Sequence, residues 1–145
     1  REILNEKNGP PPEINLFNEK NNGETVLSLI NMKFVKSAHD ISLGGILVAI
    51  AKMCIKGKKG AILKKPKYLI NQLEYLFGED QGRYIIEIEK KDFKSVLEIL
   101  NKNSVHYDEL GNVTEKDLVI DDKTKVSIDD LVKSNTTWLI NYMSK

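Results

Sequence analysis

The chain has very little cysteine and no excess charge of either sign. Its one cysteine, Cys54, excludes an internal disulfide and a cysteine-rich metal site. The 22 lysines and arginines face 21 aspartates and glutamates, for a net charge of +1, so no strong field attracts nucleic acid or an anionic membrane. The longest apolar run, residues 46–51, is far below the roughly 18 residues of a membrane span, and no signal-peptide pattern opens the chain. We expect a cytoplasmic protein that binds neither nucleic acid nor a membrane.

Proline is also scarce, and three of the four prolines are consecutive, Pro10 to Pro12. Such a run favours extended backbone and cannot lie inside a helix or a central strand. Residues 1–15 are therefore predicted to be a linker from an upstream domain. Residues 16–145, in a chain with 41% hydrophobic residues, are predicted to form one C-terminal domain. Because the first residue is Arg1 rather than methionine, we expect a piece of a longer protein.

The apolar spacing predicts an α+β domain with a small mixed β-sheet flanked by helices, in α/β/α layers. Helices are expected at 16–30, 45–55, from Pro66 through Leu76, after Asp92 and after Ser127; strands are expected at 32–39, at 83–89 and on both sides of Gly111. The helix at 45–55 is apolar nearly all round and is predicted to be mostly buried. Residues 56–67 are predicted to be a basic, solvated loop.

Two of these elements carry predictions about which side chains share a face. Alternation in the strand at 83–89 places Tyr84, Ile86 and Ile88 on one face. In the last helix, the apolar residues expected to point into the core are Ile128, Leu131, Trp138 and Leu139.

The segment SAHDISLGGILVAIAKM, residues 37–53, places Gly44 and Gly45 where a predicted strand gives way to the buried helix. The first turn of a helix has unpaired N–H groups and a partial positive charge, so glycines there allow an anion to approach closely. Ser42 could cap the helix or contact such a ligand. Two glycines can equally serve a tight turn that is needed for packing, and the spacing does not separate the two interpretations.

Two motifs give this chain a family resemblance. SAHDISLGGILVAIAKM resembles the AHDxSxGGL segment of the C-terminal domains of the aminoimidazole ribonucleotide synthetase superfamily. The later LFGEDQGRYIIEIE is similar to the FGExQGR segment of one branch, the phosphoribosylformylglycinamidine synthases. GPPPEINL, LGNVTEKDLVI and SIDDLVKSNTTWLINYM follow the same order, so the resemblance extends over nearly the whole chain.

The resemblance implies the last of four domains in a large ligase subunit. Such a subunit uses ATP and Mg²⁺ to convert formylglycinamide ribonucleotide and glutamine-derived ammonia to the amidine in purine biosynthesis. Its implied partners are the upstream domains of the same chain, a glutaminase subunit and a small bridging subunit. The family's catalytic histidine and metal ligands lie in the preceding domains, so no catalytic residue, metal ligand or cofactor is expected in this fragment alone. The alternative is a stand-alone, non-catalytic binding or assembly module with the same fold.

The same resemblance suggests where a remodelled substrate or phosphate site would lie. Glu79, Asp80 and Gln81 match the place where the first-half copy of the family holds its substrate. The full set of candidate residues is Ser42, Gly44, Gly45, Glu79, Asp80, Gln81 and Arg83. Leu43 stands where the family commonly has an acidic residue, and a leucine can neither accept a hydrogen bond nor bind a cation.

Other polar residues favour structural roles. His39 and Asp40 are adjacent and are expected to make structural hydrogen bonds to a turn rather than to act as acid and base. Arg83 is expected to pair within its own turn, with Glu79 as the predicted partner. Cys54 is predicted to be a small buried hydrophobic residue. His106, Asp108 and Glu109 are of metal-ligand type, but strand alternation would send the two acids to opposite faces.

Overall fold

The computed structural model describes residues 13–65, 71–122 and 124–144. The described part of the chain contains the helices α1 (Leu16–Asn31), α2 (Gly45–Gly57), α3 (Gln72–Phe77), α4 (Phe93–Lys102) and α5 (Ile128–Met143), and the strands β1 (Val35–Asp40), β2 (Gly60–Leu63), β3 (Tyr84–Ile88), β4 (Gly111–Thr114), β5 (Asp117–Ile120) and β6 (Thr124–Ser127). A short 3₁₀ turn, Lys90–Asp92, precedes α4. Most of the predicted linker, residues 1–12, and the predicted helix start at Pro66 and Leu69 lie outside the described residues.

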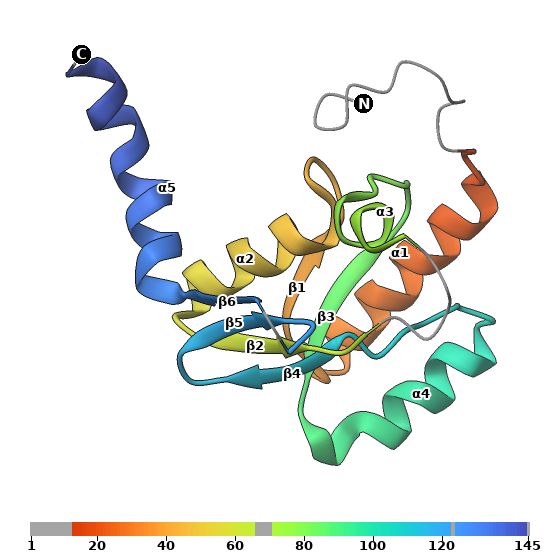
Figure 1. Cartoon of the computed structure of the whole chain (residues 1–145). Coiled ribbons are helices and arrows are strands. Elements are labelled where there is room, and N and C mark those ends of the chain that lie inside the picture. Colours follow the sequence, from red (N-terminus) through yellow and green to blue (C-terminus); the bar gives the residue numbers. More distant parts are fainter. Residues whose placement is uncertain (1–12, 66–70, 123, 145) are drawn as a thin grey trace.

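The strands form two sheets. β1 and β3 make an antiparallel pair, and the other four strands form a mixed sheet in the order β4-β2-β5-β6, with β2 and β5 parallel. Figure 1 shows α1 and α4 on one side of the β1–β3 pair and α2 on its other side, where α2 also covers the four-stranded sheet. The predicted α+β fold, with mixed sheet and helices in layers, is confirmed.

Helix α2 is apolar on nearly all sides because it packs against both sheets. Ile46, Ala49, Ile50 and Cys54 of α2 are buried in one core cluster, together with Leu63, Leu76, Ile85, Leu118, Ile120 and Ile128 from the surrounding elements. The prediction of a mostly buried helix is therefore confirmed, and the apolar pattern has a structural cause.

A second core cluster lies on the opposite face of the β1–β3 pair. Leu29 of α1 and Val96 and Leu100 of α4 are buried there, and Ile86 and Ile88 of β3 pack against them. Strand β3 is thus covered on both faces, because Ile85 points the other way into the first cluster. Tyr84 lies on the same side as Ile86 and Ile88, since a Cβ atom at Gly23 of α1 would be 3.3 Å from the Tyr84 hydroxyl, so the predicted shared face is confirmed, although Tyr84 is partly exposed.

Three sequence expectations about elements are wrong in part. The basic stretch at 56–67 contains β2, an inner strand of the four-stranded sheet. Gly111 begins β4 instead of separating two strands, and residues 105–110 are irregular. Asp92 precedes α4 as predicted, but its side chain makes no capping hydrogen bond.

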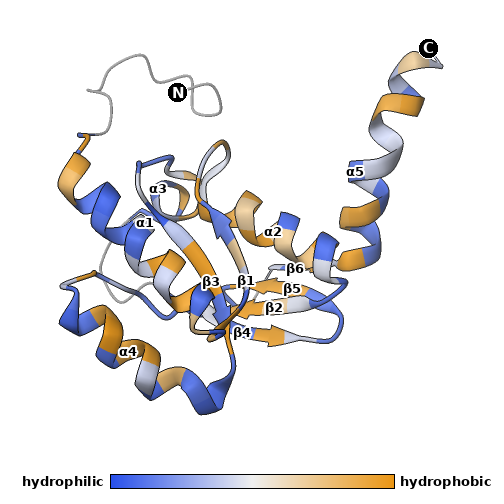
Figure 2. Ribbon diagram, turned by 180° about the vertical axis from the view of Figure 1, so that it is seen from behind, coloured by the Kyte–Doolittle hydropathy of each residue, from blue (hydrophilic) through white to orange (hydrophobic). Residues whose placement is uncertain are grey.

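Helix α5 is anchored at its start only. The Ser127 hydroxyl accepts from the backbone N–H of Asp130 at 3.0 Å, so the predicted cap is confirmed, and Ile128 is buried. Beyond the first turns the helix extends away from the body of the domain (Figures 1 and 2). Trp138 and Leu139 are 64% and 59% exposed, which contradicts their predicted place in the core. Within the described ranges, none of the helices is both long enough and apolar enough to cross a membrane.

Candidate functional site

Two loops lie next to each other and bring most of the candidate residues together. One loop connects β1 to α2, and the other connects α3 to β3. They border a hollow of about 320 Å³, which is lined by Glu19, Asp40, Ile41, Ser42, Leu43, Glu79, Gln81, Gly82, Arg83 and Tyr84. Ser42, Glu79, Gln81 and Arg83 therefore share one surface, although nearly 40 residues separate the two loops. We call this surface the loop-pair site.

Gly44 occupies the start of α2 and already has an anionic partner. Its backbone adopts the left-handed region, with φ of 86°, and its N–H donates to Glu79 Oε1 at 2.7 Å. A carboxylate at the N-terminal end of a helix is favoured by the helix dipole. The N–H that could receive an external anion is thus occupied by a side chain of the other loop.

Gly45 is required by close packing of backbone on backbone. A Cβ atom at this position would lie 2.6 Å from the carbonyl carbon of Phe77 and 2.8 Å from the carbonyl oxygen of Gly78, and φ is +68°. Its N–H donates to the backbone carbonyl of Ser42 at 3.0 Å. No side chain caps α2 at Gly44, so the Ser42 hydroxyl does not have the capping role suggested from the sequence.

Arg83 bonds to residues of its own loop, between α3 and β3. Its Nη2 donates to the carbonyl oxygen of Gly78 at 2.7 Å and lies 3.2 Å from Asp80 Oδ2. The expected internal pair is present, but with Asp80 as the partner instead of Glu79. Asp80 is therefore held by Arg83 and does not line the hollow.

The charges at the loop-pair site do not suit a polyphosphate. Glu19, Asp40 and Glu79 contribute three carboxylates to the lining, while Arg83 is its one cation and is already engaged with Gly78 and Asp80. Like charges in one small hollow repel an anionic ligand. In the described ranges, no group of three or more histidine, cysteine, aspartate or glutamate side chains is placed to hold a metal ion.

The remaining polar candidates have structural partners. His39 Nδ1 hydrogen-bonds to the backbone carbonyl of Asp40. His106 Nε2 lies 3.5 Å from Asp108 Oδ2, whereas the neighbouring Glu109 pairs with Lys64 at 2.6 Å.

Cys54 is buried as expected. Burial, with a smaller contribution from the charge of Glu87, raises the pKa of the Cys54 thiol. A raised pKa leaves less thiolate at neutral pH, which disfavours a nucleophilic role.

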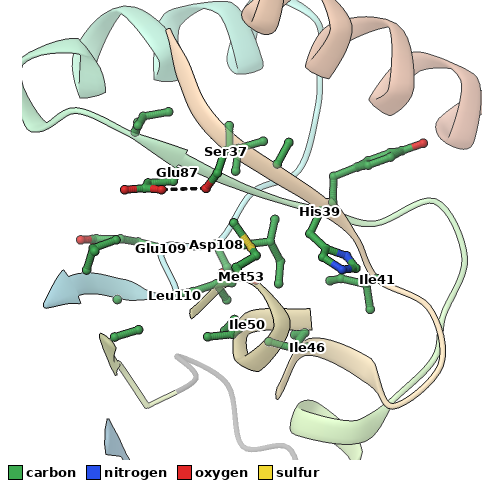
Figure 3. A pocket seen from close by; sticks show the side chains of 18 of the residues that line it. Ser37, His39, Ile41, Ile46, Ile50, Met53, Glu87, Asp108, Glu109 and Leu110 are labelled. Atoms are coloured by element: carbon green, nitrogen blue, oxygen red, sulfur yellow. Dashed lines mark hydrogen bonds between the residues drawn. The ribbon is translucent and has the colours of Figure 1, made fainter. Parts of the chain in front are cut away.

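A larger cleft has no signal in the sequence. It measures about 1430 Å³ and lies between the β1–β3 pair, α2 and the segment that leads into β4. Figure 3 shows Ser37 and Glu87 on one side, Ile50 and Met53 of α2 below them, and Asp108 to Leu110 opposite. The Ser37 hydroxyl donates to Glu87 Oε2 at 2.7 Å. Ser37, Ile50 and Met53 belong to the segment 37–53 and Glu87 to the second motif, but nothing in either motif indicates that the fold places them beside Asp108 to Leu110.

Comparison with known proteins gives a consistent result. Residues 1–123 match the family described as AIR synthase related protein, C-terminal domain. The chain is 76% identical over 143 residues to the phosphoribosylformylglycinamidine synthase subunit PurL of Pelagibacter ubique. The aligned region covers 99% of this chain and 20% of that protein. The corresponding subunit of Bartonella bacilliformis is 40% identical over 143 residues, again 99% of this chain and 19% of that protein. The chain thus spans about a fifth of the length of these relatives.

Solved structures agree on the fold. Phosphoribosylformylglycinamidine synthase II from Thermotoga maritima superposes with a TM-score of 0.70 and 25% identity, over 83% of this chain and 22% of that chain. Thermotoga maritima PurL complexed with FGAR gives a TM-score of 0.72 at 23% identity, over 89% of this chain and 23% of that chain.

Proposed function

The chain belongs to the family of AIR synthase related proteins, as their C-terminal domain, and on that premise we propose that it is the C-terminal domain of a phosphoribosylformylglycinamidine synthase. The observation that carries this proposal is the 76% identity over 143 residues to the Pelagibacter ubique subunit. Because this identity extends over 99% of the chain, the two proteins share the whole domain and not only one motif.

The complete polypeptide would act in purine biosynthesis in the cytoplasm. It would convert formylglycinamide ribonucleotide to the amidine, using ATP, Mg²⁺ and ammonia that a glutaminase subunit releases from glutamine. Thermotoga maritima PurL has been solved with FGAR and with ATP, and also as the assembly PurLQS, which supports substrate, nucleotide and partner subunits for the relatives. The upstream domains of the same polypeptide, a glutaminase subunit and a small bridging subunit are the proposed partners here.

We assign ATP and Mg²⁺ to other parts of that polypeptide. The loop-pair site does not fit a nucleotide, because its carboxylates outnumber its single, already paired arginine. This chain's own contribution is a wall beside the ligand-binding domains, formed by the two loops that carry Ser42, Gly44, Gly45, Glu79, Asp80, Gln81 and Arg83; of these, Ser42, Glu79, Gln81 and Arg83 line the hollow. A substrate phosphate could reach the Gly44 N–H only after Glu79 has moved away, since the Glu79 carboxylate occupies that donor.

The test starts from the native polypeptide. A tag placed after Lys145 would allow the protein to be purified from cells and weighed. A mass several times 16.5 kDa, together with ATP-dependent amidine formation from formylglycinamide ribonucleotide and added ammonia, is the expected result. A mass near 16.5 kDa would contradict the proposal and favour a stand-alone binding or assembly module. A large polypeptide that is inactive with ammonia as the nitrogen donor would also contradict it.

A further inference from the structure

Strand β3 has a free edge that opens into the large cleft. Its antiparallel partner β1 occupies one edge, and no other strand in the described part of the chain pairs with it. All five residues of β3, Tyr84 to Ile88, line the cleft. The second edge of β3 thus has no strand partner among the described residues, and the cleft borders β3 along its whole length, as it also borders residues 36–39 of β1.

The two faces of β3 make this free edge unusual. Ile85 packs into the α2 cluster, and Ile86 and Ile88 pack into the cluster of α1 and α4. Ile85 is buried and Ile86 and Ile88 are partly buried. A strand packed on both faces is typical of the inside of a sheet, whereas exposed edges are normally short, charged or covered. A two-stranded sheet is also marginally stable by itself. The packing therefore indicates that β3 is an inner strand of a larger sheet.

The cleft has the walls that an additional strand requires. Residues 105–113 lie opposite β3, and they include the start of β4, whose second edge also lacks a partner among the described strands. Met53 and Cys54 of α2 line one side, and Val96 and Leu97 of α4 line the other. The volume of about 1430 Å³ exceeds the roughly 300–1,000 Å³ of ordinary small-molecule pockets.

We propose that an extended segment of the same polypeptide, from outside residues 1–145, fills this cleft and pairs with β3 as an additional strand. The chain covers 20% of the length of the Pelagibacter ubique relative, so in a polypeptide of that size most residues lie outside it. A covalently linked segment has a high effective concentration and needs little intrinsic affinity. The inference rests on this longer polypeptide, which the proposed function also requires, and not on the ligase reaction.

The lining predicts the character of the inserted strand. The side chains that face α4 meet Val96, Leu97 and Leu100 and should be apolar. The side chains that face α2 meet Cys54 and the Ser37–Glu87 hydrogen bond, so one hydrogen-bond donor on this side would suit the Glu87 carboxylate. An alternating strand with two covered faces fulfils both conditions.

Hydrogen exchange of the full-length, ligase-competent polypeptide tests the pairing at single-amide resolution. In an edge strand every second amide points away from its neighbour and exchanges fast, whereas an inner strand protects consecutive amides. We expect all five amides of β3, Tyr84 to Ile88, to exchange slowly. Fast exchange of alternate amides in an active enzyme would overturn the inference and leave the proposed function intact. A polypeptide of only about 16.5 kDa would overturn both.

A photo-crosslinker identifies the occupant. Val113 of β4 lines the cleft and is 51% exposed, so Val113→p-benzoylphenylalanine places the reactive group in the cleft of the full-length protein. We expect a crosslink within one polypeptide to a segment outside residues 1–145. Lys20→p-benzoylphenylalanine, on the exposed surface of α1, is the control that should not capture this segment. A crosslink from position 113 to a second molecule, or to none, would contradict the proposal.

Discussion

A side chain at position 45 has no room, because the first residue of α2 lies against the backbone of the other loop. The Cβ atom of an alanine would be 2.6 Å from the carbonyl carbon of Phe77, and the backbone would remain at a φ of +68°. Overpacking and left-handed backbone strain each cost roughly 1–3 kcal/mol. Gly45→Ala should therefore lower the free energy of unfolding of the chain by at least about 2 kcal/mol, as measured in urea.

Gly57, at the other end of the same helix, is the matched control for this substitution. A Cβ atom there meets nothing within 4 Å, so Gly57→Ala should leave the chain as stable as before or stabilise it by up to roughly 1 kcal/mol. Equal unfolding free energies for the two variants would show that the contact with Phe77 does not constrain position 45.

Glu89 should remain ionised at unusually low pH. Hydrogen bonds from Lys36 at 2.7 Å and Lys91 at 2.6 Å lower the pKa of Glu89 from 4.5 to about 2. Because the folded pKa is depressed, the contribution of these pairs is fully present above pH 4.5 and is lost as the pH falls toward about 2. The group is exposed, so the effect on stability is small and is screened by salt.

A carboxylate titration followed by NMR checks this directly. Lys36→Met should move the midpoint of Glu89 back up toward 4.5, because it removes the largest cause of the shift. Lys20→Met, which removes a cation remote from Glu89, should leave the midpoint unchanged. A midpoint near 4.5 in the unaltered chain would show that the two lysines are not bound to Glu89 in solution.

At the scale of elements, the two ends of α5 should respond differently to the same kind of truncation. Ile128 is 8% exposed within the core cluster, so Ile128→Ala should cost roughly 2–4 kcal/mol of unfolding free energy. Leu139 is 59% exposed on the projecting half, so Leu139→Ala should cost less than about 0.5 kcal/mol. Urea unfolding of both variants measures the difference.

Trp138 reports on the same helix independently. It is the single tryptophan of the chain and stacks on Tyr142, with ring centroids 5.5 Å apart, on the exposed end of α5. Its emission should be that of a solvated indole and should be quenched readily by acrylamide. A blue-shifted, protected emission in the monomeric chain would instead place this end of α5 against the domain.

The sequence predicted correctly those elements whose apolar spacing results from packing against a single neighbour. Helix α4 was predicted correctly because Val96 and Leu100 are spaced to face a single neighbour, and both are buried. Strand β2 was missed because its short apolar run is surrounded by lysines that suggested a loop. Trp138 was misplaced because periodicity identifies an apolar face but does not reveal whether another element covers it.

The candidate site shows the same limit. The motifs located the two loops, and the structure places most of the predicted residues around one hollow. The role of each residue depends on partners that are distant in sequence: Gly44 meets Glu79, and Gly45 meets Phe77. No spacing rule within one segment predicts such contacts. The large cleft escaped prediction for the same reason, since its walls come from many separate parts of the chain.

At the scale of the whole molecule, the described residues expose single apolar side chains on α1, such as Leu16 and Phe17, and apolar surface at two further places. One is the cleft beside β3, and the other is the projecting half of α5, where Ile140 and Met143 are 66% and 75% exposed. Large exposed apolar patches mark surfaces that are covered in the functional assembly. The isolated chain should therefore bind the dye 8-anilino-1-naphthalenesulfonate with a clear gain in fluorescence while its circular dichroism shows the native helix content.

Truncation separates the two surfaces. A chain ending at Thr136 lacks the exposed end of α5 but keeps the cleft, so it should retain a substantial part of the dye fluorescence. Val113 lines the cleft and is half-exposed, so Val113→Lys in the full 145-residue chain places a charge on the cleft wall. This variant should lower the dye fluorescence more than the control Lys20→Met does. If fluorescence disappears on truncation alone, the cleft is closed in the isolated chain, and β3 does not have the open edge from which an additional strand was inferred.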